Sequence, residues 1–184
     1  MKYLSIDTET TGLNPETCQV LSIALVLEDT NAPEVPVEEL PHIHLIIRRD
    51  YLQGEPYAIN LNKDIIQIIK EGRDERLTHP DKVFKEIENF LYDNGFNPGK
   101  LKVAGKNFAS FDKEFIKRME GFDTFEFSFH HRVLDVGPLF LDFKNDEWVP
   151  GLDTCMERAG VTGTVQHCAY EDSKDVIRVI RAKQ

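Results

Sequence analysis

Residues 2–12 read KYLSIDTETTG, an apolar run that leads into two carboxylates and a turn. Branched and aromatic residues without a breaker predict a β-strand over residues 2–6. Because side chains alternate along a strand, Asp7 and Glu9 project to the same side of it. Two anions on one side repel each other unless a cation lies between them, and Mg²⁺ prefers such oxygen ligands. The alternative is a solvated turn, since Asp, Thr and Gly are common turn residues.

Length and composition predict one globular domain over residues 1–184. With 41% hydrophobic and 29% charged residues, the composition is that of an ordinary soluble protein. No apolar run approaches the roughly 20 residues of a membrane span, and the N-terminus lacks the features of a signal peptide. The three cysteines show no metal-ligand spacing, so we interpret them as reduced, buried thiols. We therefore expect a cytoplasmic protein without a membrane partner.

The charge distribution argues against binding of long nucleic acid by a broad basic surface. The net charge is −10, whereas sequence-independent affinity for nucleic acid comes from Lys and Arg. The charge is uneven, because residues 16–41 contain six acidic residues and no Lys or Arg, and residues 100–118 contain six basic residues and two acidic ones. The basic segment can contact phosphates, although scattered solvated charges explain each residue equally well.

The hydrophobic pattern predicts an α/β fold with a mixed sheet. Apolar runs at 20–27 and 43–47 follow the first strand through short links, which favours an antiparallel meander. Two further strands are expected at 101–104 and within 125–135. Helices are expected around 61–69, 83–95, 110–119, 137–142, 152–159 and 170–182, with Asp81 capping the second.

Two more carboxylates lie on helix faces that should be buried. Asp112 precedes Phe115 by three residues and continues an apolar stripe, and Asp172 precedes Val176 by four residues in the same way. A buried anion is strongly disfavoured unless it is paired or binds a metal. Capping of the helix start explains either residue alone slightly better. Together with the pair on the first strand, four carboxylates can hold two divalent ions about 3.5–4 Å apart for phosphoryl displacement.

A histidine in the polar loop before the last helix is a candidate base. His167 stands five residues before Asp172 and can overhang the same site, where it would take a proton from the water that a metal activates. The alternative is an exposed loop histidine. The other five histidines have no comparable spacing and are interpreted as structural.

Three motifs together resemble those of the DEDDh 3′–5′ exonucleases. Residues 7–13 (DTETTGL) resemble the first motif, residues 107–112 (NFASFD) the second, and His167 with Asp172 the third. They occur in the family order and span most of the chain. The family that the chain resembles includes polymerase III proofreading subunits and oligoribonucleases. The resemblance implies a ribonuclease H-like fold. That fold is a mixed five-stranded sheet with helices on both faces.

The resemblance also implies roles for individual residues. The metal-binding acids would be Asp7, Glu9, Asp112 and Asp172, holding two Mg²⁺ or Mn²⁺ ions, and His167 would be the general base. Leu13 matches an apolar wedge beside the terminal base, and Thr10 would contact the terminal sugar. Substrate contacts are implied at Thr10, Leu13, Asn107 and Phe111. Lys106 departs from the family, in which many members have His at this position.

We therefore expect a metal-dependent 3′–5′ exonuclease that degrades single-stranded nucleic acid or short oligonucleotides to nucleoside 5′-monophosphates. Its expected partners are single-stranded DNA or RNA 3′ ends, and homodimerisation is left open. The alternatives are a proofreading subunit of a replication complex, a non-catalytic module that binds nucleic-acid ends, and a small-molecule phosphohydrolase. The end of the chain at Gln184, just after the last motif, argues against the first alternative. Retention of all four acids argues against the second.

Overall fold

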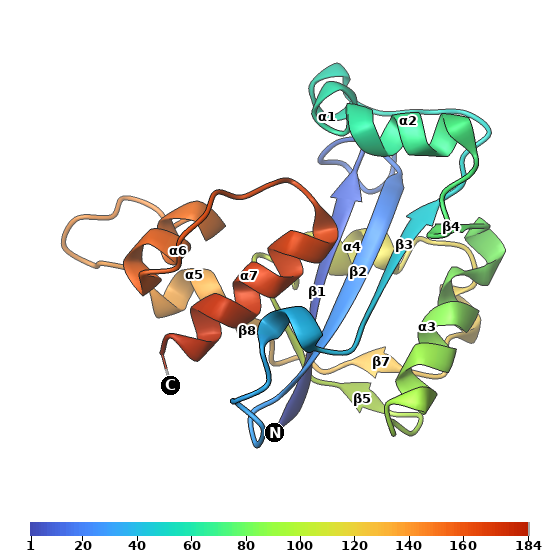
Figure 1. Ribbon diagram of the computed structural model, residues 1–184. Helices are drawn as coiled ribbons and strands as arrows, with labels where there is room; N and C mark the ends of the chain where they lie inside the picture. Colours follow the sequence, from blue (N-terminus) through green and yellow to red (C-terminus); the bar gives the residue numbers. More distant parts are fainter. Residues whose placement is uncertain (184) are drawn as a thin grey trace.

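The computed structural model describes residues 1–183 and contains a six-stranded sheet and a two-stranded one. The strands are β1 (Lys2–Thr10), β2 (Val20–Asp29), β3 (His42–Ile47), β4 (Leu77–Thr78), β5 (Lys100–Leu101), β6 (Val103–Gly105), β7 (Ser128–Phe129) and β8 (Leu134–Asp135). The large sheet has the order β4-β3-β2-β1-β6-β8, and β5 pairs with β7 (Figure 1).

The predicted mixed sheet and its antiparallel meander are confirmed. Strand β1 pairs antiparallel with β2, and β2 with β3, whereas β6 lies parallel to β1 on its other side. The large sheet has six strands rather than five. The additional pairing comes from β4, and β4 and β8 contain two residues each. Such short strands have no alternating pattern that a sequence can reveal.

Helices cover both faces of the sheet (Figure 1). They are α1 (Pro56–Leu61), α2 (Lys63–Glu71), α3 (Val83–Asp93), α4 (Asp112–Ile116), α5 (Val136–Leu139), α6 (Leu152–Ala159) and α7 (Ala169–Arg181), with 3₁₀ turns η1 (Val37–Glu39), η2 (Pro80–Lys82) and η3 (Phe122–Thr124). Within residues 1–183, no helix combines the length and the apolar character that a membrane span requires.

Two predicted helices differ from the structure. The helix expected over 110–119 is the short α4, because after Ile116 the backbone continues in turns, with hydrogen bonds from Arg118 N to Phe115 O and from Met119 N to Ile116 O. The apolar pattern around 61–69 is divided between α1 and α2 by a break at Asn62. The cap expected from Asp81 is also absent, since this residue lies within η2 and its carboxylate contacts Nδ1 of His79 at 2.7 Å.

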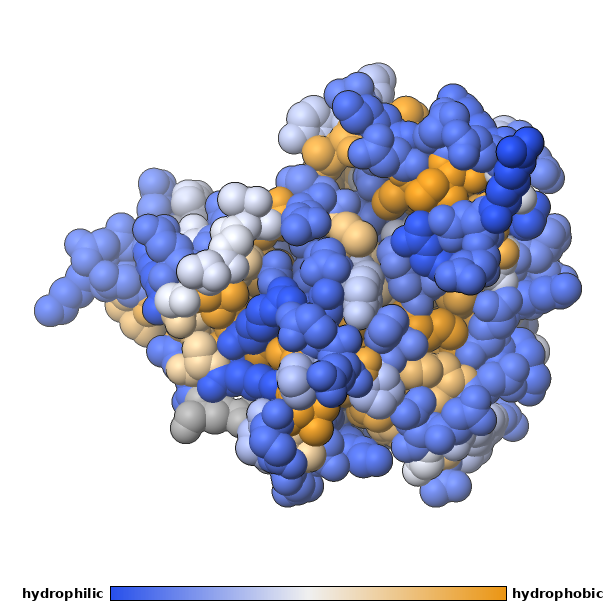
Figure 2. Space-filling view, viewed as in Figure 1, coloured by the Kyte–Doolittle hydropathy of each residue, from blue (hydrophilic) through white to orange (hydrophobic). Residues whose placement is uncertain are grey.

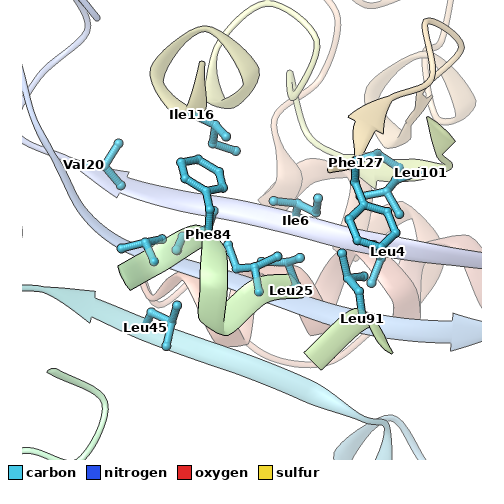
Figure 3. Packing of buried hydrophobic residues seen from close by; sticks show 14 of the residues in the cluster. Leu4, Ile6, Val20, Leu25, Leu45, Phe84, Leu91, Leu101, Ile116 and Phe127 are labelled. Carbon is cyan, nitrogen blue, oxygen red and sulfur yellow. The ribbon is translucent and has the colours of Figure 1, made fainter. Parts of the chain in front are cut away.

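Alternation along β1 divides the core into two clusters. Leu4 and Ile6 pack among Leu25, Phe84 and Leu91 on the face that α3 and α4 cover (Figure 3). The other cluster lies between the opposite face of the sheet and helices α5, α6 and α7. The odd-numbered residues of β1 face α7, and the two carboxylates that end this series therefore lie beneath the start of that helix.

Ion pairs at the C-terminal end of α7 attach this helix to the sheet. Arg181 Nε donates to Oε2 of Glu28 on β2 at 2.7 Å, and Nη1 of Arg181 donates to the carbonyl of Val35, also at 2.7 Å. Arg178 Nη2 contacts Oε1 of Glu38 at 2.6 Å. Glu28 is buried, and removal of one partner from a buried pair typically costs about 3–5 kcal/mol. These contacts fix the helix whose first turn contributes to the site described next.

Candidate active site

Three carboxylates from opposite ends of the sequence meet where β1 ends and α7 begins. Oxygen atoms of Asp7, Glu9 and Asp172 all lie within 4.8 Å of one another. Glu9 is 8% exposed and Asp172 is 7% exposed, while Asp7 is partly accessible. The strand supplies the first two because residues i and i+2 share a face, and the helix presents the third from its first turn. The structure thus brings together three of the four predicted metal ligands.

Asp112, the fourth predicted ligand, reaches this region from the other face of the sheet. Strand β6, the neighbour of β1, ends at Gly105, and the chain then turns into α4 beyond the edge of that strand. Asp112 is 2% exposed, and its Oδ1 accepts hydrogen bonds from Thr8, at 3.0 Å from the backbone N and 2.7 Å from Oγ1. Its charge raises the pKa of both Asp7 and Glu9.

All four carboxyls hold their protons more tightly than in water. Burial, followed by the charges of the other three acids, raises the pKa of Asp7 well above its usual value. Burial, followed by the charges of Asp172 and Asp112, raises the pKa of Glu9 to about 8. Burial raises the pKa of Asp172 to about 7 and that of Asp112 to about 6, although hydrogen bonds from Thr8 oppose the second shift.

These residues fit a hard divalent cation. The donor set consists of carboxylate oxygens, which such ions prefer, and a cation would remove the repulsion that raises the pKa values. Asp172 Oδ1 is buried and has no hydrogen-bond partner among residues 1–183. Helix capping does not explain this unpartnered atom, whereas ligation of a cation would. The hydrogen bonds from Thr8 explain part of the burial of Asp112.

His167 lies outside the group of carboxylates. Its side chain is exposed in the loop between α6 and α7, and its φ of 50° is in the left-handed region. It lines a cavity of about 510 Å³ together with Leu152 and Asp153 at the start of α6. The next residue, Cys168, is close enough to Asp7 to affect the pKa of that carboxyl. His167 is therefore near the site in sequence but is directed away from the carboxylates.

The predicted substrate-binding residues differ in their exposure and in the contacts that they make. Leu13 is 74% exposed, as a wedge for a base requires, and its N–H donates to Oε1 of Glu55 at 3.1 Å. Thr10 is buried, and its Oγ1 donates to the carbonyl of Gly12 at 2.8 Å. Asn107, with a φ of 60°, forms the turn into α4 and accepts backbone hydrogen bonds on its carbonyl. Phe111 packs against Phe115, with ring centroids 5.0 Å apart.

The structure adds one residue that the sequence did not reveal. Asn62, at the break between α1 and α2, is 4% exposed, and its Nδ2 donates to the carbonyl of Thr10 at 3.1 Å and to that of Ala58 at 3.2 Å. The amide of Asn62 also opposes the rise in the pKa of Glu9. Asn62 therefore fixes the backbone at Thr10, directly after Glu9. A lone asparagine within an apolar helical pattern carries no sequence signal for this role.

Comparison with known proteins gives a consistent family. A protein-family model described as "RNase_T: Exonuclease" matches residues 4–180. The oligoribonuclease of Neisseria meningitidis serogroup B (strain ATCC BAA-335 / MC58) is 25% identical over 188 residues, which cover 96% of this chain and 87% of the relative. The oligoribonuclease of Neisseria gonorrhoeae (strain ATCC 700825 / FA 1090) is 25% identical over 185 residues, covering 94% and 90%.

Solved structures share the fold at lower identity. Cell-death related nuclease 4 (CRN-4) superposes with a TM-score of 0.66 at 13% identity, over 98% of this chain and 62% of that one. Exonuclease I of E. coli, solved in complex with a dT13 oligonucleotide, has a TM-score of 0.63 at 18% identity, over 98% and 40%. This chain thus spans less than two thirds of either structure, and at these identities the likeness concerns the fold alone.

The raised pKa values predict how stability depends on pH and on metal. In the unfolded chain these carboxyls ionise near pH 4, whereas the metal-free folded protein keeps protons on Glu9 to about pH 8 and on Asp172 to about pH 7. The folded state binds more protons, so the free energy of unfolding falls as pH rises through this range. We expect the melting temperature in EDTA to decrease from pH 6.5 to 8.5 and saturating Mg²⁺ to restore it.

Between pH 6.5 and 8.5, the effect of these carboxyls on stability can be distinguished from that of another buried titratable group. Burial lowers the pKa of His44 to about 4, which gives the opposite slope but only below about pH 6.5. Asp7→Asn should make the decrease shallower, because one of the repelling charges is gone. A melting temperature in EDTA that is constant or rises between pH 6.5 and 8.5 would contradict the assignment.

Asn62→Ala should weaken metal binding by about tenfold or more, which is the usual effect of removing a group that orients a metal ligand. Isothermal titration with Mn²⁺ measures this. Asn94→Ala is a matched control, because Nδ2 of Asn94 donates to the carbonyl of Phe90, four residues earlier, at the end of α3. Equal Mn²⁺ affinity in both variants would show that Asn62 only stabilises the helix break.

Proposed function

The chain belongs to the exonuclease family and is a 3′–5′ exonuclease, and we propose that it degrades single-stranded nucleic acid or short oligonucleotides to nucleoside 5′-monophosphates. The observation that carries this proposal is the convergence of Asp7, Glu9 and Asp172 within 4.8 Å, with Asp112 close by. A non-catalytic module that binds ends has no need to keep four mutually repelling acids at one point.

Members of this family generally depend on divalent metal ions. We propose that Asp7, Glu9, Asp112 and Asp172 hold two ions, Mg²⁺ or Mn²⁺. When bound, such a pair polarises the scissile phosphate, lowers the pKa of water and stabilises the charge on the leaving oxygen. The unpartnered Oδ1 of Asp172 supports this assignment, because no donor among residues 1–183 stabilises a charge on this buried oxygen, whereas a bound cation would.

The chain itself supplies orientation and proton transfer. We propose that Leu13 lies beside the terminal base and that Thr10 and its neighbouring backbone contact the terminal sugar. Water attacks the phosphorus, the bond from phosphorus to the 3′-oxygen breaks, and a ring nitrogen of His167 takes the proton of the water. Because His167 is exposed and directed away from the carboxylates, its loop has to move toward them for this step.

Charge and surface support a short, single-stranded substrate. The net charge of −10 disfavours an extended duplex, whose sequence-independent binding needs many Lys and Arg contacts. The face shown in Figure 2 is mostly hydrophilic, with separate hydrophobic areas rather than one continuous apolar patch. The names of the relatives agree with this choice, since the curated ones are oligoribonucleases and exonuclease I was solved with a dT13 oligonucleotide.

Asp7→Asn should abolish hydrolysis, by about 10³-fold or more, without unfolding the protein, because it removes a ligand shared by the site and one source of repulsion. Single-stranded DNA and RNA of 2 to 20 nucleotides, labelled at the 5′ end, would be incubated with Mg²⁺ or Mn²⁺, and the products identified by chromatography. We expect nucleoside 5′-monophosphates and a ladder that shortens from the 3′ end. Asp123→Asn, in an exposed 3₁₀ turn, is the control. Near wild-type turnover of Asp7→Asn at saturating Mg²⁺ would refute the proposed site.

His167→Ala should lower kcat by roughly 10²–10⁴-fold with little effect on Mn²⁺ affinity, since the residue moves a proton and does not bind the metal. In the wild-type protein, turnover should fall toward acidic pH, because a protonated imidazole cannot accept the proton of the water. The control is His79→Ala, which removes another exposed histidine. If the acidic limb of the pH profile is unchanged in His167→Ala, another group is the base.

A further inference from the structure

A second cavity lies beside the carboxylate site, on the face of the sheet that α3 and α4 cover. It has a volume of about 580 Å³, and its apolar lining includes Val20, Ile47, Phe115 and Met119. Two guanidinium groups, those of Arg49 and Arg118, line the same cavity. Because Val20, Ile47 and Phe115 are almost fully buried, the guanidinium groups are the main feature that the cavity offers, and they suit a ligand with an anionic group.

Arg49 is a partly buried cation without a counterion. Its Nε and Nη2 both donate to the neutral carbonyl of Val20, at 3.3 and 2.8 Å, and it forms no ion pair among residues 1–183. Burial lowers the pKa of its guanidinium. Within residues 1–183, three other arginines also form no ion pair, and all three are exposed: Arg48, Arg73 and Arg132. Removing a cation from water without an anion is unfavourable, so the position favours an anionic ligand.

The acidic residues around the cavity leave this cation available. Arg118 is already paired, because its Nη1 lies 3.3 Å from Oε2 of Glu114 and its Nη2 lies 4.0 Å from Oε1 of Glu16. Glu120 also lines the cavity and its charge acts on the Arg49 guanidinium, although no ion pair within 4.0 Å joins the two among residues 1–183. The cavity therefore offers one unpaired positive charge, enough for one phosphate, in a protein whose net charge is −10.

Residues that line the cavity are neighbours of the carboxylates at the end of β1, although the cavity itself lies on the opposite face of the sheet. Val20 pairs with Thr10, the residue after Glu9, across neighbouring strands. Phe115 follows Asp112 by three residues on α4, one turn of the helix further on. The loop that carries the exposed Leu13 passes between the two, since its residues Pro15 and Cys18 also line the cavity.

We propose that this cavity binds an upstream nucleotide of the strand whose 3′ end occupies the carboxylate site. Arg49 pairs with a backbone phosphate, and the half-buried Met119 offers the nucleotide an apolar contact. The strand bends around Leu13 to reach it. This inference rests on the proposed function, and it adds a length requirement, because a strand gains the contact with Arg49 only when it extends beyond the terminal residues.

The test measures binding as a function of strand length. Full-length Asp7→Asn protein would be titrated in Mg²⁺ against 5′-labelled oligo(dT) and oligo(U) of two, four and eight nucleotides, by fluorescence anisotropy. Adding Arg49→Ala should weaken binding of the eight-nucleotide strands by about tenfold, the lower end for a hydrogen bond to a charged group. The loss should be much smaller for two nucleotides. Arg48→Ala, the exposed neighbouring arginine, is the matched control, and Arg49→Lys should recover part of the affinity.

Several results would overturn the proposal. An equal loss at every length would mean that Arg49 only supports the start of β2 through the Val20 carbonyl. An equal loss in Arg48→Ala would show that any nearby positive charge has the same effect on binding. Weaker binding of free 5′-dTMP in Arg49→Ala would show that the cavity binds the product instead. Hydrolysis of the same strands by wild-type protein in Mg²⁺ tests the proposed function separately. If that hydrolysis is absent, the exonuclease assignment fails irrespective of Arg49.

Discussion

Electrostatic repulsion among buried carboxylates is the constraint on which the rest of this structure depends. Asp7, Glu9 and Asp172 are held with oxygens within 4.8 Å of one another, and the charge of Asp112 acts on the first two. Without a cation, this arrangement opposes folding and has to be maintained by contacts elsewhere. The buried pair of Arg181 and Glu28 holds α7 at its far end, so that the first turn of the helix remains over the strand.

The parts of the fold that a sequence can encode locally were predicted well. The meander of β1, β2 and β3 follows from continuous apolar runs, and α7 follows from the spacing of Asp172 and Val176. The carboxylate pair on β1 follows from the two-residue period of a strand. For Asp112, polarity was the informative property, because an acid within an apolar stripe needs a partner. Its hydrogen bonds to Thr8 supply part of that partnership.

The remaining features depend on tertiary contacts that leave no local pattern. Strand β4 exists because a short segment lies beside the longer β3, not because its own residues favour extension. Asn62 interrupts an apolar helical pattern, and its importance is visible only once its amide is seen to reach the Thr10 carbonyl. Arg49 is likewise an ordinary arginine in the sequence. For His167 the spacing to Asp172 predicts proximity, but it does not determine the direction of the side chain, which faces solvent.

The site draws its ligands from both ends of the chain, and this has a consequence for biosynthesis. Asp7 and Glu9 leave the ribosome first, whereas Asp172 lies in the last helix, 163 positions after Glu9. Until α7 has been synthesised and packed against β1 and β2, the strand has only part of its ligand set. A nascent or prematurely terminated polypeptide is therefore unable to assemble the complete centre. The connectivity of the fold thus delays assembly of the complete site until α7 has been synthesised and has folded.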